Sequence, residues 1–243
     1  MNKIDKAIIR VDASLKIGSG HVMRCLTLAE ALRELGTEVQ FVCRWHFGNL
    51  IELIREKGFV VHELPVLENI ELGRIYEYNS GSVYENWLGV SQEQDARETI
   101  TVFQKNKPDW LIVDHYGLVQ VWEKKLRPHV HKIMVIDDLA NRSHDCDLLL
   151  DQNYFIDGES RYEDLVPETC TKLLGPQYAL LRSEFTQARK QLKPRIGKIE
   201  RVFVFFGGND LENVTGKALE ALSFQEFNCL DVDVVIGSHN PHL

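Results

Sequence analysis

The segment Ala7-Ile8-Ile9-Arg10-Val11, followed closely by Ile17-Gly18-Ser19-Gly20-His21-Val22-Met23-Arg24, decides the fold of this chain. The first run is short and apolar, as expected of a buried strand. From Val22 onward apolar residues recur every three to four positions, which predicts a helix. A strand that leads through a glycine turn into a helix is the opening unit of an α/β sheet.

The glycine turn places a titratable side chain at the start of the predicted helix. Glycine lets the backbone approach a ligand closely, and the free amides of a helix N-terminus favour an anion such as phosphate. The same field disfavours the protonated form of His21, so a neutral imidazole can accept a proton. We therefore predict chemistry beside a phosphorylated substrate; the alternative is a turn that only packs a strand on a helix.

Two common cofactor motifs are absent from this turn. The dinucleotide fingerprint needs a third glycine where Met23 stands, and no Gly-Lys-Ser/Thr follows as in a P-loop. We expect neither a nicotinamide nor a flavin, and no other cofactor. The strings Asp145-x-Asp147 and Asp231-x-Asp233 match a metal-binding pattern, but each stands where an apolar run begins, so we predict no metal site.

Composition limits the class of protein. The chain has 243 residues and a net charge of −8, which argues against nucleic acid as its main partner. Its five cysteines include no Cys-x-x-Cys pair, which predicts reduced thiols. The N-terminus lacks an apolar signal core, and no run approaches the ~20 apolar residues of a membrane span. We expect a cytoplasmic protein that binds no membrane, and we make no prediction of its oligomeric state.

Strand and helix signals alternate along the chain, which indicates a parallel sheet covered on both faces. Residues 65–90 are expected to be irregular, with a loop tip at 79–82. The expected strands are 7–11, 38–43, 59–64, 110–114, 132–136 and 147–150, and the expected helices after the first are 50–57, 92–107, 119–130 and 180–191.

A polar stretch at 192–199, punctuated by proline and glycine, is the predicted linker between two domains. Beyond it the pattern restarts with a strand at 202–206, a glycine turn, a helix at 210–222 and a strand at 232–236. One such unit cannot bury both faces of a sheet. We therefore predict an α/β domain over 1–191 and the opening part of a second α/β domain over 200–243.

Ligands of an open parallel sheet gather at the carboxyl ends of its strands, and polar residues of this chain fall there. Such side chains could bind a sugar or cap the helices that follow. Asp114 and Asp138 fit the capping role best, whereas Tyr116, on a turn beside a glycine, fits a substrate contact. The residues are Asp12, Ser14, Asp114, His115, Tyr116, Asp137, Asp138, Asp151, Gln152 and Asn153.

The turn Phe206-Gly207-Gly208-Asn209-Asp210 repeats the pattern of the first one, with a strand, glycines and a helix start. Two such turns, one in each half of the chain, could face each other across a cleft and bracket a diphosphate. The alternative is again a plain tight turn.

Taken in order, six segments of the chain resemble the PseG family of UDP-2,4-diacetamido-2,4,6-trideoxy-β-L-altropyranose hydrolases, which act in pseudaminic acid biosynthesis and are related to the glycosyltransferase MurG. The similarity covers essentially the whole chain. The segments are Arg10-Val11-Asp12-Ala13-Ser14, Gly18-Ser19-Gly20-His21-Val22-Met23-Arg24, Asp114-His115-Tyr116-Gly117, Ile136-Asp137-Asp138, Tyr178-Ala179-Leu180-Leu181-Arg182-Ser183-Glu184-Phe185 and Phe206-Gly207-Gly208-Asn209-Asp210.

This resemblance implies a two-domain GT-B architecture with the active site between the domains. It implies that His21 is the catalytic histidine, that Tyr116 lies near the reacting sugar, and that water inverts the anomeric carbon without a metal. UDP is a good leaving group, so a base that activates water is the group the reaction needs most. Family members are longer, and the part that grips uridine lies mainly in the second domain, so we expect a shortened chain to lose most of its nucleotide affinity.

The other predicted site residues follow from the same turns and strand ends. Arg24 shares a helix face with His21 and could orient the ligand or anchor the helix to a carboxylate. The alternatives to a hydrolase are a GT-B glycosyltransferase and an inactive sugar-binding half that needs a partner chain. The predicted substrate contacts are Gly20, Arg24, Tyr116 and Asn153, and the predicted diphosphate contacts are Gly207, Gly208 and Asn209.

Overall fold

The computed structural model describes residues 4–65, 84–103, 107–156, 158, 160–194, 196–208, 210–237 and 240–242. The chain divides into two compact units, Met1–Arg182 and Ser183–Leu243. The predicted loop tip at 79–82 lies outside the described residues. In these ranges no helix combines the length and the apolar character needed to cross a bilayer.

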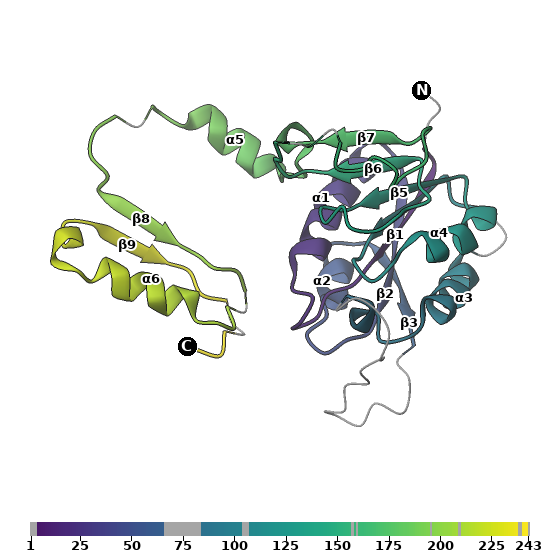
Figure 1. Ribbon diagram of the computed structural model, residues 1–243, viewed down its shortest axis with the longest axis horizontal. Coiled ribbons are helices and arrows are strands. Elements are labelled where there is room, and N and C mark those ends of the chain that lie inside the picture. The colour runs from purple at the N-terminus through teal and green to yellow at the C-terminus, as the bar shows by residue number, and fades with distance from the viewer. Residues whose placement is uncertain are drawn as a thin grey trace. The chain divides into compact units, whose positions relative to one another are not determined.

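The first unit is built on a seven-stranded sheet in the order β3-β2-β1-β4-β5-β6-β7, and every neighbouring pair is parallel (Figure 1). The chain builds outward from β1 to β3 and then crosses back to place β4 on the other side of β1. The predicted parallel α/β sheet is therefore confirmed. Its strands are β1 (Lys6–Val11), β2 (Glu38–Arg44), β3 (Val60–Leu64), β4 (Trp110–Asp114), β5 (Lys132–Ile136), β6 (Leu148–Asp151) and β7 (Thr171–Leu174).

Helices cover both faces of this sheet, with α1 and α2 on one side and α3 and α4 on the other (Figure 1). The α3 helix starts where Ser91 accepts a hydrogen bond from the amide of Gln94, an N-cap contact. The helical elements are α1 (Gly20–Glu34), α2 (Ile51–Glu56), η1 (Glu85–Trp87), α3 (Gln92–Val102), α4 (Gln120–Leu126), η2 (Arg127–His129) and η3 (Pro176–Tyr178).

The core has two layers because alternate residues of each strand point to opposite faces. Ile8 packs in the layer that contains Trp122, whereas Ile9 packs in the layer that contains Phe41, and all four side chains are fully buried. Burial of each such side chain stabilises the fold by about 1.5–3 kcal/mol. The apolar strands thus anchor the sheet and hold its carboxyl edge in place.

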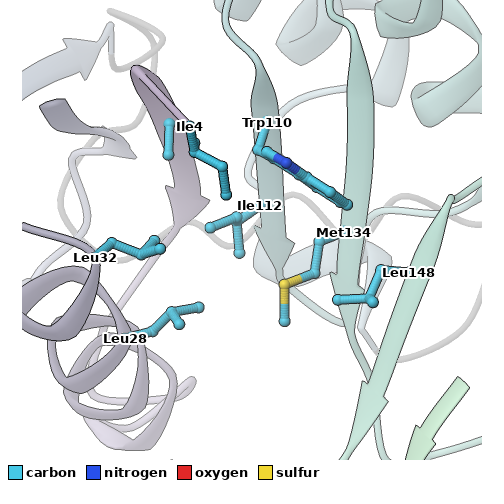
Figure 2. Close-up of a pocket in the computed structure, with 8 residues that line it drawn as sticks. Ile4, Leu28, Leu32, Trp110, Ile112, Met134 and Leu148 are labelled. Atoms are coloured by element: carbon cyan, nitrogen blue, oxygen red, sulfur yellow. The ribbon is translucent and has the colours of Figure 1, made fainter. Parts of the chain in front are cut away.

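A cavity of about 150 Å³ lies at the opposite, amino-terminal edge of the sheet. Figure 2 shows its lining side chains, which converge from the second half of α1 and from the neighbouring strands. The lining offers no titratable or hydrogen-bonding group suited to catalysis. It consists of Ile4, Ala7, Leu28, Leu32, Trp110, Ile112, Met134 and Leu148.

The second unit contains α5 (Ser183–Gln191), β8 (Arg201–Val204), α6 (Val214–Leu222), η4 (Gln225–Phe227) and β9 (Asp231–Val234). Its two strands pair in parallel, as a strand–helix–strand unit requires. We assigned the helix at 180–191 to the first domain, but α5 belongs to the second unit, and none of its described side chains is buried. The predicted linker at 192–199 therefore lies inside that unit, between α5 and β8.

The strand β7 was not predicted from the sequence. It is short and only half-buried at best, and it pairs with β6 at the edge of the sheet. A run of this length carries too little periodicity to be distinguished from a loop.

Candidate active site

His21 lies in the first turn of α1, which begins at Gly20. The preceding turn closes through a hydrogen bond from the amide of Gly18 to the carbonyl of Ser14 at 2.8 Å, with Gly18 at φ +81°. An added Cβ at Gly20 would meet nothing within 4 Å, so the helix start is open there. A residue beside a glycine turn is expected to face solvent, but the His21 side chain is only 8% exposed, because a hydrogen-bond partner draws it toward the sheet.

That partner is Asp114, the last residue of β4, which is fully buried beside Val11 of β1. Its Oδ1 lies 2.6 Å from Nδ1 of His21. Burial opposes ionisation of Asp114, but His21 and Arg24 outweigh it and hold the pKa of this carboxyl below its usual range. Because an ionised carboxylate only accepts, we assign a proton to Nδ1, so in the neutral imidazole the lone pair lies on Nε2. Within the described part of the chain, Nε2 has no hydrogen-bond partner.

Arg24 binds the same carboxylate with two nitrogens. Its Nε and one terminal nitrogen each lie 2.6 Å from an oxygen of Asp114, and the other terminal nitrogen lies 3.6 Å from Asp138. The side chain is 13% exposed. Of the two predicted roles of Arg24, this geometry favours anchoring the helix to a carboxylate over orienting a ligand.

Tyr116 and Asn153 meet on Asp138. The Tyr116 hydroxyl donates to Oδ1 at 2.5 Å, and the Asn153 amide donates to Oδ2 at 3.1 Å. Burial, followed by this carboxylate, raises the pKa of Tyr116 above its ordinary value. The Tyr116 ring stands edge-on to His21, with centroids 4.6 Å apart. The expected capping role of Asp114 and Asp138 is wrong, because both carboxylates are occupied by side chains across the sheet edge.

A buried ionic layer under this edge was missed from the sequence. Arg10 binds Asp12 at 2.6 Å and Asp95 at 2.7 Å, and Asp95 also accepts from the indole of Trp122 at 3.0 Å. Each of these side chains is almost fully buried. The signal that could have found the layer is Arg10 itself, a cation inside an otherwise apolar strand, because a buried charge needs a partner.

His115 joins this layer with its Nε2 3.4 Å from Asp12. The amide of Gly117 donates to Nδ1 at 3.0 Å, so that nitrogen carries the lone pair. Burial lowers the pKa of His115 to about 3, despite the attraction of Asp12. His115 is therefore a neutral imidazole with a structural role.

The second glycine turn has a different environment. Gly207 also has φ +81°, but the amides at the start of α6 are occupied by the chain itself. Asp210 accepts from the amides of Val214 and Thr215 at 2.8 and 2.9 Å, and Asn213 accepts from Gly216 at 3.1 Å. Asn209, a predicted diphosphate contact, lies outside the described residues.

The two Asp-x-Asp strings pair with arginines. Arg127 binds Asp145 at 3.1 Å and Asp147 at 2.5 Å, and Arg201 binds Asp233. Among the residues that the structure describes, no group of three or more His, Cys, Asp or Glu side chains could hold a metal ion. These strings therefore serve as ion-pair partners near strand starts.

Comparison with solved structures defines the class of the protein. The structure is similar to that of Acinetobacter baumannii MurG, with a TM-score of 0.52 and 10% identity, over 96% of this chain and 67% of that one. At this identity the likeness shows the fold alone. The chain is thus an α/β protein of the GT-B type, as predicted.

Sequence comparison identifies the family. No family model matches the sequence. The chain is 32% identical over 240 residues, 98% of its length and 72% of the relative, to the UDP-2,4-diacetamido-2,4,6-trideoxy-beta-L-altropyranose hydrolase of Campylobacter jejuni. It is also 26% identical over 191 residues, 76% of its length and 47% of the relative, to an uncharacterized glycosyltransferase of Methanosarcina mazei. The chain belongs to the family of the Campylobacter hydrolase, and the predicted resemblance is confirmed.

Proposed function

We propose that this protein hydrolyses a UDP-linked diacetamido-trideoxy sugar, with release of UDP, as a step of pseudaminic acid biosynthesis. One observation carries the proposal: Nδ1 of His21 is fixed by the buried Asp114, so its Nε2 is left as a base at the carboxyl edge of the sheet. Family membership supplies the substrate class, because the Campylobacter relative is a hydrolase of such a sugar.

In the proposed reaction, Nε2 of His21 takes a proton from water as the water oxygen bonds to the anomeric carbon. The bond from that carbon to the phosphate oxygen breaks, and UDP leaves with the electron pair. Attack from the face opposite to UDP inverts the anomeric carbon, as in inverting glycoside hydrolysis, with imidazole in place of a carboxylate. Asp114 stabilises the imidazolium that forms and keeps the ring oriented.

The remaining predicted residues have supporting roles in this proposal. Tyr116 and Asn153, held together on Asp138, contact the sugar, and the open helix start at Gly20 gives it room. Gly207, Gly208 and Asn209 are proposed to contact the diphosphate. Arg24 acts indirectly, because it binds both Asp114 and Asp138 and so fixes the partners of His21 and Tyr116.

A glycosyltransferase is the second candidate function. The Methanosarcina relative, described as a glycosyltransferase, and the fold shared with MurG favour it. In that reaction an acceptor hydroxyl replaces water at the same base. The third candidate is an inactive sugar-binding half that requires a partner chain for the nucleotide.

The deciding experiment is a product assay by NMR with the UDP-linked sugar in ¹⁸O-labelled water, with and without added sugar acceptors. We expect UDP and free sugar without any acceptor, the label in the sugar, and an inverted anomer when spectra are recorded before mutarotation. UDP release only when an acceptor is present would replace the hydrolase by the transferase. No turnover, together with no binding of UDP, would favour the inactive half. The His21→Asn variant is the matched control for contaminating hydrolase.

A further inference from the structure

We propose that Tyr84, Trp87 and Tyr116 form an aromatic wall that binds the methyl-bearing face of the substrate sugar. This inference rests on the proposed function for the nature of the ligand and deepens it, since it names the residues that select the sugar. Tyr84 and Trp87 belong to no motif that the sequence analysis singled out. They lie in and just before η1, distant in sequence from His21.

The three rings form a continuous surface that begins at the proposed base. The Tyr116 ring lies 4.6 Å from His21, Tyr84 lies 5.2 Å from Tyr116, and Trp87 lies 4.8 Å from Tyr84 and 5.8 Å from Tyr116, all between ring centroids. These separations are typical of aromatic pairs in contact. The wall therefore extends from the reacting position along the segment that precedes α3.

The backbone holds this segment against the turn that follows β4. A Cβ added to Gly117 would lie 2.5 Å from the carbonyl oxygen of Tyr84, so the two segments touch backbone to backbone and only glycine fits. Leu88, the residue after Trp87, is 1% exposed and packs in the core with Leu118. The wall is thus fixed to the same sheet edge as Asp114 and Tyr116.

The rings of the wall remain partly exposed, unlike the aromatic residues of the core. Trp122 and Tyr162 are fully buried, whereas Tyr84, Trp87 and Tyr116 are intermediate in exposure. Aromatic carbon left partly open beside a base is what small-molecule sites use to bind apolar ligand surface.

Two polar side chains beside the wall, the Tyr116 hydroxyl and the Arg142 guanidinium, are engaged by carboxylates of the protein. The Tyr116 hydroxyl donates to Asp138, so the ring is the larger surface that Tyr116 offers to a ligand. Arg142 lies 5.5 Å from the Tyr116 ring and pairs with Asp137 at 2.6 Å. A hydroxyl pressed against this wall would lose its hydration without a partner, whereas a methyl group would not. The wall therefore favours a sugar with methyl groups, from a deoxy carbon or acetamido substituents, over one with hydroxyls.

The test measures binding of the free 2,4-diacetamido-2,4,6-trideoxy sugar by saturation-transfer NMR, which also reports which ligand protons touch the protein. For the wild type we expect the strongest transfer to methyl protons. Trp87→Ala should weaken binding about tenfold and lose that pattern, while Trp87→Phe, which keeps a ring, should stay within about threefold. Leu35→Ala is the matched control, because Leu35 is 77% exposed at the far end of α1. Unchanged affinity of folded Trp87→Ala would overturn the wall.

A second variant and a second ligand keep the test independent of folding and of the proposed reaction. Trp87→Leu retains apolar volume, so we expect this variant to fold. Weakened sugar binding by the folded variant would support an aromatic contact to the sugar, and unchanged sugar binding would contradict it. UDP affinity should be the same in all variants, and a parallel loss of UDP binding would overturn a sugar-specific role. If the wild-type protein binds the sugar but releases no UDP from the UDP-linked sugar, the hydrolase proposal is wrong, and the proposed sugar-binding role of the aromatic wall is still supported. If Trp87→Ala hydrolyses the substrate normally with an unchanged KM, only the proposed role of the aromatic wall is wrong.

Discussion

The two glycine turns of this chain look alike in sequence and differ in what surrounds them. Both follow a strand, both contain a glycine at φ +81°, and both precede a helix. At the first turn, His21 meets a buried carboxylate from another strand, at a sequence distance of 93 residues. At the second, Asp210 and Asn213 bind the amides of their own helix.

The comparison teaches that the surroundings of a glycine turn before a helix are set by the neighbouring strand as well as by the turn itself. The strand before the first turn, β1, pairs with β4, and Asp114 at the end of β4 binds the imidazole of His21. The start of α6 satisfies its free amides locally, which is the ordinary N-cap arrangement. A diphosphate contact of Gly207 and Gly208 is part of the proposed function.

The largest effect is expected when the imidazole is removed from the first turn. His21→Asn should lower kcat about 10³-fold, because no base then activates water, as measured by UDP release. It should also cost about 1–3 kcal/mol in the free energy of unfolding, since the buried Asp114 loses a hydrogen bond. Met23→Ala is the control, because Met23 lies two residues after His21 in α1 and is 37% exposed. Near-normal turnover of folded His21→Asn would remove the proposed base.

A smaller loss of activity is expected when only the partner of the imidazole is changed. Asp114→Asn should lower kcat about 10²-fold and alter the pH profile of kcat, because an amide can donate to Nδ1 and favour the wrong tautomer. Asp109→Asn is the matched control at the other edge of the sheet, where Asp109 accepts from backbone amides of Asp5 and Lys6. An unchanged pH profile in the Asp114 variant would mean that this carboxylate only supports the fold.

Alanine substitutions at two glycines, Gly237 and Gly208, test the packing of the second turn. A Cβ at Gly237 would lie 2.0 Å from the Gly208 carbonyl, whereas a Cβ at Gly208 would meet nothing within 4 Å. Gly237→Ala should therefore destabilise the second unit by about 1–3 kcal/mol, and Gly208→Ala should leave its stability unchanged. Hydrogen exchange of the second unit measures both. Weaker UDP binding in Gly208→Ala would support a diphosphate contact; equal stability of the two variants would contradict the close approach.

The effect expected to be smallest near neutral pH is a pH dependence confined to the first unit. The pKa of His115 is lowered to about 3 by burial, so the unfolded chain binds an extra proton between roughly pH 6.5 and pH 3. Stability from this residue is therefore full at neutral pH and is lost as the pH falls, by at most about 1.4 kcal/mol per pH unit. His115→Gln should flatten this slope in unit-resolved hydrogen exchange. A slope that persists unchanged between about pH 6.5 and pH 4 would show that His115 is not its source.

The sequence by itself determined most elements of the fold and the position of the proposed base, His21. Apolar periodicity located β1, β2, β4 and β5 and the helices between them, because core contacts impose the spacing of each element locally. The glycines before Val22 located His21 at the start of a helix for the same local reason. Family resemblance supplied the reaction, and the comparison confirmed the family.

Only the tertiary structure decided which residues contact His21. The pairing of Val11 with Asp114 places β4 beside β1, so the carboxylate that looked like a cap meets His21 and Arg24. The edge strand β7 and the wall formed by Tyr84 and Trp87 were likewise set by packing. The physical reason is that strand order and register arise from contacts between distant segments, and local periodicity does not encode them.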